Sequence, residues 1–117
     1  MGKFWLAALA SAFWLASAFA QPWPAKPPTL IAGTPPGGAI DVYARAIAEH
    51  MTGTLGQQVL VEYKPGANGN ISAEFVLRAP ADGYTIWIGT QSMTEISPSA
   101  YDALRWKFDD FAGVIKG

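Results

Sequence analysis

The chain has 117 residues, a formal charge of −1 and no cysteine. A near-neutral chain without a lysine or arginine cluster lacks the charge that binds phosphate backbones, which excludes nucleic acid as a partner. Without cysteine, disulfides, thiolate metal sites and cysteine nucleophiles are excluded as well, and the length allows at most one small domain.

The first twenty residues have the pattern of a secretory signal peptide. Lys3 supplies a positive start, residues 4–19 are uncharged and mostly apolar, and Ala18-Phe19-Ala20 fits the small-residue cleavage pattern. An uncleaved anchor is the alternative, because the apolar run lies near the lower limit of ~17 residues for a membrane span. We therefore expect a leader at 1–20 and a mature chain at 21–117.

A Pro-Gly turn follows the first predicted strand. Residues 21–28 contain four prolines and are expected to be extended, and the apolar run 29–33 predicts a buried strand. Residues 34–41 (Thr-Pro-Pro-Gly-Gly-Ala-Ile-Asp) then predict a turn whose glycine amides are free to bind an anion at the positive end of a helix. A plain connecting turn is the alternative interpretation.

The next segment predicts an amphipathic helix that ends near residue 53 or 56, where glycines stand. Its apolar positions recur every three or four residues: Ile40, Tyr43, Ala44, Ile47, Ala48 and Met51. Asp41, in the first turn, is expected to complement the helix dipole or to cap a free amide. Arg45 and Glu49 are expected to form a solvated pair.

The pattern of strand, loop and helix is then repeated. Residues 57–63 predict a second strand, 64–70 a glycine-rich loop, and Ile71, Phe75 and Ala79 the apolar side of a second short helix. Residues 84–89 predict a third strand and 90–94 a polar loop. Because ligands bind outside the carboxyl ends of strands in an open α/β sheet, we expect the three loops to share one crevice.

The remaining residues predict surface structure. Residues 97–101 suggest a short helix with Pro98 at its first position, and 105–111 a connection whose aromatic rings cover the sheet. The loop at 64–70 matches neither GxxxxGK[ST] nor GxGxxG, so a phosphate cradle is not expected. His50, the only histidine, has no metal-ligand neighbours and is expected on the surface near a helix end.

Seven short motifs follow one another along the chain. They run, in order, Lys26-Pro27-Pro28-Thr29-Leu30-Ile31, Pro35-Pro36-Gly37-Gly38-x-x-Asp41-x-x-Ala44-Arg45, Leu55-Gly56-Gln57-x-Val59-x-Val61-Glu62, Lys64-Pro65-Gly66-Ala67-x-Gly69-Asn70-Ile71, Ala81-Asp82-Gly83-Tyr84-Thr85-Ile86, Gly89-Thr90 and Asp110-Phe111-Ala112. Any one motif is common, whereas the ordered set is specific. From about Pro24 to the end, the chain resembles the tripartite tricarboxylate transporter substrate-binding proteins, the Bug or TctC-like extracytoplasmic receptors.

The resemblance implies an α/β fold: part of a periplasmic-binding-protein-like lobe with a mostly parallel central sheet and flanking helices (a βαβαβ start), incomplete without a second lobe. It implies a periplasmic receptor that passes a small carboxylate to the membrane subunits of a transporter, with no cofactor. The carboxylate would be bound largely by backbone amides after the first strand. The implied ligand-binding residues are Thr34, Pro36, Gly37, Gly38, Ala39, Asp41, Asn68, Gly69, Thr90, Gln91 and Ser92.

The chain departs from the family pattern at several positions. Gly33-Thr34 replaces a bulky Pro-Phe pair, Asn68 replaces a glycine, and Ser72 replaces another. Two other functions stay open: a truncated, non-functional exported remnant, and an α/β enzyme. The enzyme is less well supported, because no serine lies in a G-x-S-x-G elbow and one histidine supplies little acid-base chemistry.

Overall fold

The computed structural model describes residues 21–96, 104 and 106–113. The predicted leader, the helix predicted at 97–101 and residues 114–117 lie outside this range. The described elements are β1 (Thr29–Ala32), α2 (Ala39–Leu55), β2 (Leu60–Tyr63), η2 (Ala67–Gly69), α3 (Asn70–Arg78), β3 (Thr85–Ile88), η3 (Ser92–Ile96) and η4 (Phe108–Asp110).

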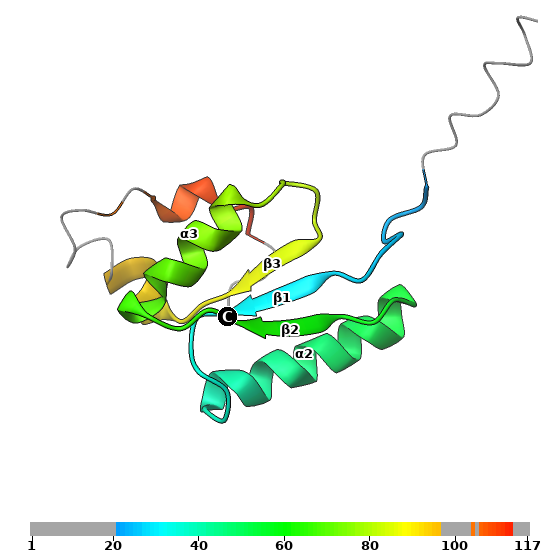
Figure 1. Cartoon of the computed structure of the whole chain (residues 1–117), viewed down its shortest axis with the longest axis horizontal. Helices are drawn as coiled ribbons and strands as arrows, with labels where there is room; N and C mark the ends of the chain where they lie inside the picture. Colours follow the sequence, from blue (N-terminus) through cyan, green and yellow to red (C-terminus); the bar gives the residue numbers. More distant parts are fainter. Residues whose placement is uncertain (1–20, 97–103, 105, 114–117) are drawn as a thin grey trace, which may run out of the picture.

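The three strands form one parallel sheet in the order β2-β1-β3. In the register, Ala32 at the end of β1 lies opposite Tyr63 of β2 and Ile88 of β3. Figure 1 shows α2 on one face of the sheet and α3 on the other. This arrangement confirms the predicted α/β fold, and each strand lies inside the run predicted for it.

Helix α2 is bounded by two glycines. Gly38 precedes its first residue, and Gly56 follows the last with a left-handed backbone (φ 68°) and donates its amide to the Thr52 carbonyl at 3.1 Å. Glycine reaches this conformation without the steric cost of a side chain, which is why it ends helices so often. Of the two predicted ends the second is correct, and Gly53 lies inside the helix.

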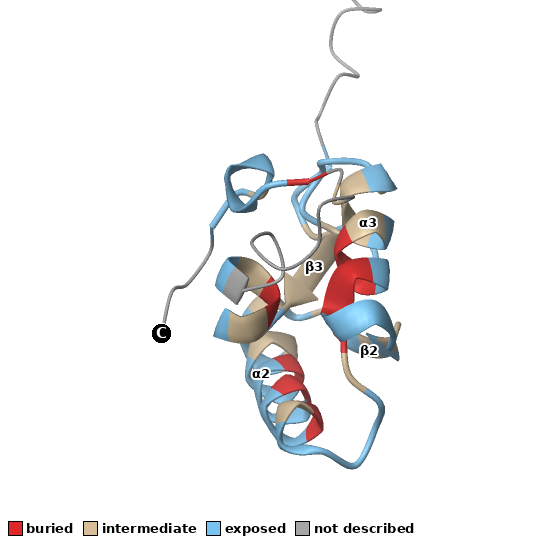
Figure 2. Cartoon of the chain, turned by 90° about the vertical axis from the view of Figure 1, so that its left-hand side faces the viewer, coloured by how far each residue is buried: buried red, intermediate tan, exposed pale blue. Residues whose placement is uncertain are grey.

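The buried face of α2 differs from the predicted stripe. Asp41, Ala44 and Ala48 are buried, whereas Tyr43 and Ile47 are 64% and 42% exposed. Figure 2 shows these buried residues along one side of the helix. Two members of the predicted apolar stripe, Tyr43 and Ile47, are thus exposed, because the alanines let the helix axis approach the sheet and leave the larger side chains on its flank.

The core between α2 and the sheet is small and made of aliphatic side chains. Leu30 of β1 is 2% exposed, and burial of a leucine side chain contributes ~1.5–3 kcal/mol. The buried members of this cluster are Leu30, Ala44, Ala48 and Val59, flanked by the partly buried Met51, Leu55, Val61, Ile86 and Ile88.

On the other face, β1 and β3 are covered by α3 and by the aromatic rings of Trp106 and Phe111. Ile31 and Ala73 are fully buried. Trp87 stacks on Phe111 with ring centroids 4.9 Å apart, and Trp106, 3% exposed, packs edge-on against Trp87 at 5.8 Å. The prediction that rings after residue 104 cover the sheet is therefore confirmed.

Helix α3 does not bury the apolar side that the sequence predicted. Ile71 and Phe75 are 52% and 40% exposed, and the buried residues are Asn70, Ser72 and Ala73. Small side chains again face the sheet, which places the helix close to the strands. This close packing positions the loop that precedes α3.

Candidate functional site

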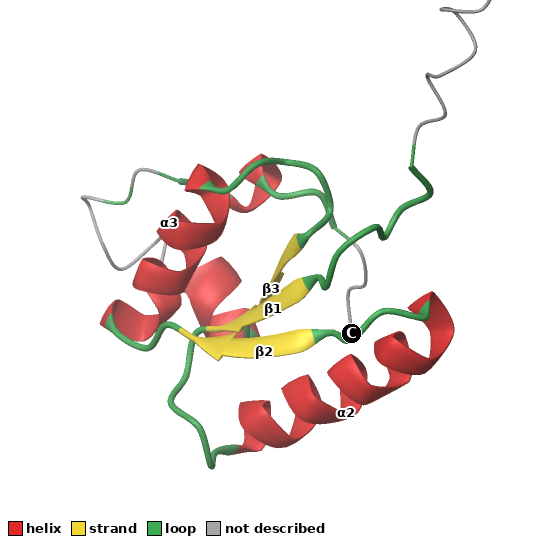
Figure 3. Ribbon diagram, turned by 45° about the vertical axis from the view of Figure 1, so that its right-hand side comes forward, coloured by secondary structure: helices red, strands yellow, loops and turns green. Residues whose placement is uncertain are grey.

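The loops after β1, β2 and β3 lie at the same edge of the sheet. The strands are parallel, so their carboxyl ends coincide, and Figure 3 shows the three arrowheads at this edge. The first loop covers residues 33–38, the second 64–69 and the third begins at 89. This edge is where open α/β sheets bind ligands, so the prediction that the three loops gather at one place is confirmed.

Direct contacts connect the three loops. Asn68 of the second loop donates its side-chain amide to the Ser92 carbonyl of the third at 3.4 Å, and the hydroxyls of Thr90 and Ser92 share a 2.8 Å hydrogen bond. A Cβ placed on Gly33 would lie 3.3 Å from the Gly69 Cα and 3.2 Å from the Met93 sulfur. Gly33 therefore brings the first loop against the other two.

The first loop shows which amides are available. The Gly37 amide donates to Asp41 Oδ2 at 2.8 Å, so the prediction that the glycine amides are free is wrong for Gly37. The Asp41 amide donates to the Gly38 carbonyl at 3.1 Å. Within the described range, the backbone amides of Gly38, Ala39 and Ile40 have no acceptor, as expected at the start of a helix.

Asp41 connects three elements through its carboxylate. It is 6% exposed, and Oδ1 accepts from the Tyr63 hydroxyl at 2.5 Å and from Arg45 Nε at 2.7 Å. The hydrogen bonds from Tyr63, Arg45 and the Gly37 amide, in that order, lower the pKa of Asp41 to about 2. The same carboxylate raises the pKa of Tyr63.

Asp41 thus caps a loop amide, as predicted, but two of its partners were not expected. Arg45 pairs with Asp41 rather than with the predicted Glu49, and the hydroxyl of Tyr63 comes from the end of a different strand. The four-residue spacing of Asp41 and Arg45 could have revealed the first contact. The second depends on the register that places Tyr63 beside Ala32, which no local pattern shows.

The second loop turns sharply into α3. Asn68 has a left-handed backbone (φ 51°), which asparagine tolerates better than most residues, and Gly69 has φ 82°. The Ser72 hydroxyl donates to the Gly69 carbonyl at 2.7 Å and accepts from the Trp87 indole at 2.8 Å. These bonds connect the loop before α3 to strand β3.

The third loop is helical rather than irregular. Met93 and Thr94 donate their amides to the Thr90 carbonyl at 2.9 and 3.1 Å, and a π-type turn, η3, follows. The Gln91 side chain donates to Glu95 at 2.8 Å and is exposed. Ser92 contacts the second loop through its carbonyl, which accepts from Asn68, whereas the Gln91 side chain bonds to Glu95 of η3.

One buried hydroxyl of the first loop lacks a partner. Thr34 Oγ1 is inaccessible to solvent and has no hydrogen bond in the described part of the chain. An unpaired buried hydroxyl carries a desolvation cost, which a ligand or a water can relieve. Among the predicted ligand-binding residues, Thr34 therefore has a buried side-chain hydroxyl that can still form a hydrogen bond.

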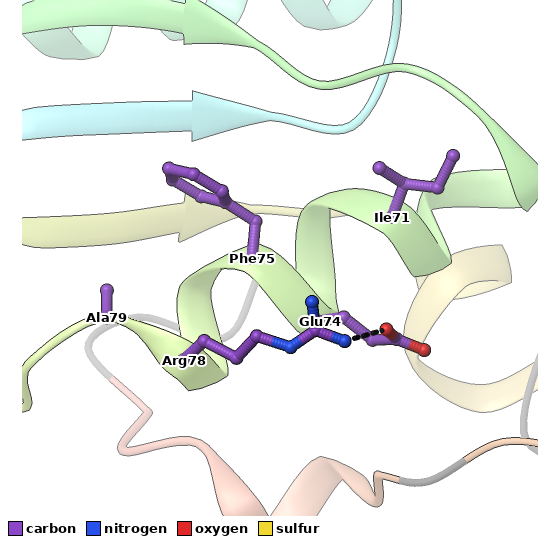
Figure 4. Close-up of a pocket in the computed structure, with 5 residues that line it drawn as sticks. All are labelled: Ile71, Glu74, Phe75, Arg78 and Ala79. Carbon is purple, nitrogen blue, oxygen red and sulfur yellow. Dashed lines mark hydrogen bonds and ion pairs between the residues drawn. The ribbon is translucent and has the colours of Figure 1, made fainter.

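A shallow apolar pocket of about 450 Å³ lies along α3 (Figure 4). Ile71 and Phe75 project to the same side of the helix, and the ion pair of Glu74 with Arg78 lies on another. The lining residues are Ile71, Glu74, Phe75, Arg78 and Ala79. None of the predicted ligand-binding residues contributes to it, so we do not place the site there.

The described residues offer no metal centre: in 21–96, 104 and 106–113, no group of three acidic or histidine side chains could bind an ion. His50 is exposed on α2, as predicted. Among the helices in this range, none has the length and hydropathy needed to cross a membrane.

Residues 43–116, more than half of the chain, match the sequence model of the tripartite tricarboxylate transporter family receptor. The chain belongs to this family. Members are substrate-binding receptors rather than enzymes. The chain spans about a quarter to a third of the length of the curated relatives it matches.

Solved structures agree with this assignment. A periplasmic transporter is 37% identical, with a TM-score of 0.70 over 74% of this chain and 29% of that chain. MatC (Rpa3494) from Rhodopseudomonas palustris, solved with bound malate, is 31% identical, with a TM-score of 0.73 over 76% of this chain and 31% of that chain. Rpa4515 from R. palustris, solved with adipate, is 40% identical, with a TM-score of 0.58 over 60% and 23%.

Proposed function

We propose that this chain is part of an exported receptor that binds a small carboxylate at the carboxyl edge of its sheet. The observation that carries the proposal is the set of unpaired amides of Gly38, Ala39 and Ile40 at the start of α2, which follows the carboxyl end of β1. Backbone amides and the positive end of a helix favour an anion. Relatives with malate and with adipate support this class of ligand.

The first loop would bind one carboxylate of the ligand. Gly38 has no side chain and an ordinary extended backbone (φ −87°, ψ 178°), so a ligand can approach the amides of Ala39 and Ile40 closely. Pro36 and Gly37 shape the turn, and the unpartnered hydroxyl of Thr34 is a further donor. Malate and adipate differ in length but share the carboxylate, which is the group that such a loop can bind.

The second and third loops would line the remaining sides of the ligand. Their side chains are uncharged and carry both donors and acceptors, which suits a polar small molecule. The residues concerned are Asn68, Gly69, Thr90, Gln91 and Ser92. Because the relatives are about three times as long, residues that read the far end of the ligand would come from outside these loops.

The proposed role in transport follows from the family. A leader at 1–20 would export the chain to the periplasm, where the receptor passes its ligand to the membrane subunits of a tripartite transporter. The similarity of this chain to the solved structure of a periplasmic transporter supports this location. Release of the leader can be checked by N-terminal sequencing of the exported protein, which should begin at Gln21.

The binding proposal is tested by titration calorimetry of the full chain with malate and adipate. A Cβ on Gly38 would meet nothing closer than 4.0 Å, so Gly38→Val should fold and place its branched side chain in the path of the ligand. We expect saturable heat with at least one acid, weakened by about tenfold or more in Gly38→Val, which is ~1.4 kcal/mol.

The matched control is Gly53→Val, which adds the same side chain at an equally open glycine of α2, ~22 Å further along the helix. Its affinity should equal that of the wild type, and circular dichroism should show all three proteins folded. A folded wild type without saturable heat, or equal affinity of Gly38→Val, contradicts the proposal.

A further inference from the structure

Asp41 differs from the other residues near the proposed site because every part of its carboxylate is already bonded. Oδ2 accepts from the Gly37 amide at 2.8 Å, and Oδ1 accepts from Arg45 Nε at 2.7 Å and from the Tyr63 hydroxyl at 2.5 Å. The residue is 6% exposed. An acceptor-only group with these three donors has little capacity left for a ligand.

The bond from Gly37 closes the first loop onto α2. Gly37 has φ 93°, a backbone conformation that residues with a side chain rarely adopt. Its amide donates to the side chain of Asp41, four residues later. Fixing this amide fixes the direction in which Gly38 enters the helix. The amides of Ala39 and Ile40 then point outward along the helix axis.

Arg45 and Tyr63, the two donors to Oδ1, reduce the repulsion between the Asp41 carboxylate and an anionic ligand. A bare carboxylate in the first turn of α2 would repel a carboxylate ligand bound at the same end of the helix. Arg45 supplies a positive charge and Tyr63 a hydroxyl, and both bonds lie on the oxygen that does not hold the loop. The network can therefore fix the loop without adding an unpaired negative charge to the site.

We propose that Asp41 is a positioning residue: it organises residues 34–38 so that the amides of Ala39 and Ile40 receive the carboxylate, and does not contact the ligand itself. The inference rests on the proposed function. It also changes the role implied by the family resemblance, in which Asp41 and Gly37 would bind the ligand.

Asparagine is the sharpest substitution at this position because it has the same shape. Its one oxygen can face either Gly37 or the pair of Arg45 and Tyr63, and its amide then faces donors on the other side. Asp41→Asn therefore cannot keep all three bonds. Tyr63→Phe removes one bond to Oδ1 and leaves the Gly37 bond in place, so it is the matched control.

The experiment combines amide hydrogen exchange by NMR with calorimetric titration of the full chain by malate and adipate. In the wild type, the Gly37 amide should be protected before any ligand is added, and its resonance should move less on titration than those of Ala39 and Ile40. This arm needs no variant, so it stands even where a substitution prevents folding.

In Asp41→Asn, Gly37 protection should be lost and the dissociation constant for the acid should rise about tenfold or more, as removal of an orienting partner does at metal sites. Tyr63→Phe should keep Gly37 protected and bind within about threefold of the wild type, since the loop bond is intact. Equal losses of affinity in the two variants, wild-type affinity in Asp41→Asn, or a Gly37 resonance that follows the ligand would each overturn the inference. A folded wild type that binds neither acid instead refutes the proposed function, so the two failures are distinguishable.

Discussion

Gly33 and Ser72 occupy one small space, and their coupling can be measured. A Cβ on Gly33 would lie 2.6 Å from Ser72 Oγ, closer than real Cβ contacts, and 3.2 Å from the Met93 sulfur. Such overpacking costs ~1–3 kcal/mol, against ~0.4–1 kcal/mol gained because alanine restricts the unfolded chain. We therefore expect Gly33→Ala to lower the free energy of unfolding by up to ~2.6 kcal/mol.

Ser72→Ala removes the obstructing oxygen but also the acceptor for the Trp87 indole at 2.8 Å. Alone it should cost ~1–3 kcal/mol, the penalty for leaving a buried donor unpaired. The double variant should lose ~1 kcal/mol less free energy of unfolding than the two single variants lose together, because Ser72→Ala removes the atom closest to the new Cβ.

The four proteins of this cycle can be compared by urea unfolding followed by circular dichroism. Equal slopes of free energy against urea would show that the native and unfolded states are comparable across the set. Costs that add to within ~0.3 kcal/mol would refute the reasoning, because independent sites behave in that way. A stabilising Gly33→Ala would also refute it.

Three further predictions concern stability and are checked by denaturant unfolding. Gly56→Ala should cost ~1 kcal/mol because φ is 68° there, whereas Gly53→Ala, at an open position inside α2, should gain ~0.5–1 kcal/mol; equal signs would contradict this. Ile31→Ala, at a fully buried residue, should cost ~2–5 kcal/mol, and Ile47→Ala, 42% exposed, less than ~1 kcal/mol. The pKa of Asp41 is lowered from 3.8 to about 2, so its contribution to the free energy of unfolding is complete above pH 3.8 and is lost as the pH falls through 2. In Asp41→Asn, the free energy of unfolding should therefore vary less with pH between about pH 1.5 and 5. An unchanged acid profile in that variant would contradict the assignment.

The order and type of the elements could be predicted from the sequence, but not which faces they bury. Short apolar runs bounded by proline or glycine mark β1, β2 and β3 correctly. The predicted apolar stripe of α2 included Tyr43 and Ile47, which are exposed, and that of α3 included Ile71 and Phe75, which are exposed as well. Periodicity gives apolar positions, whereas the distance between helix and sheet, set by small residues, decides which of them are buried.

The position of the site was predictable for a general reason, since parallel strands place their following loops at one edge. The use of its hydrogen-bonding groups was not. A turn with two glycines suggests free amides, but the Gly37 amide is taken by Asp41 Oδ2, and the other oxygen of this carboxylate accepts from Tyr63 of another strand. Such a network can be predicted only when the strand register is known, because Asp41 and Tyr63 are 22 residues apart in the chain.

The loop edge has two separate supports. Asp41 holds the first loop from the α2 side of the sheet through Gly37, whereas Gly33 packs on the α3 side against Ser72 and Met93. Residues 33 and 72, at which the sequence departs from the family pattern that the resemblance implies, both lie on the second support. The Gly37–Asp41 bond of the first support lies directly before the first turn of α2. We therefore expect the amides of that turn to depend more on this bond than on packing at Gly33.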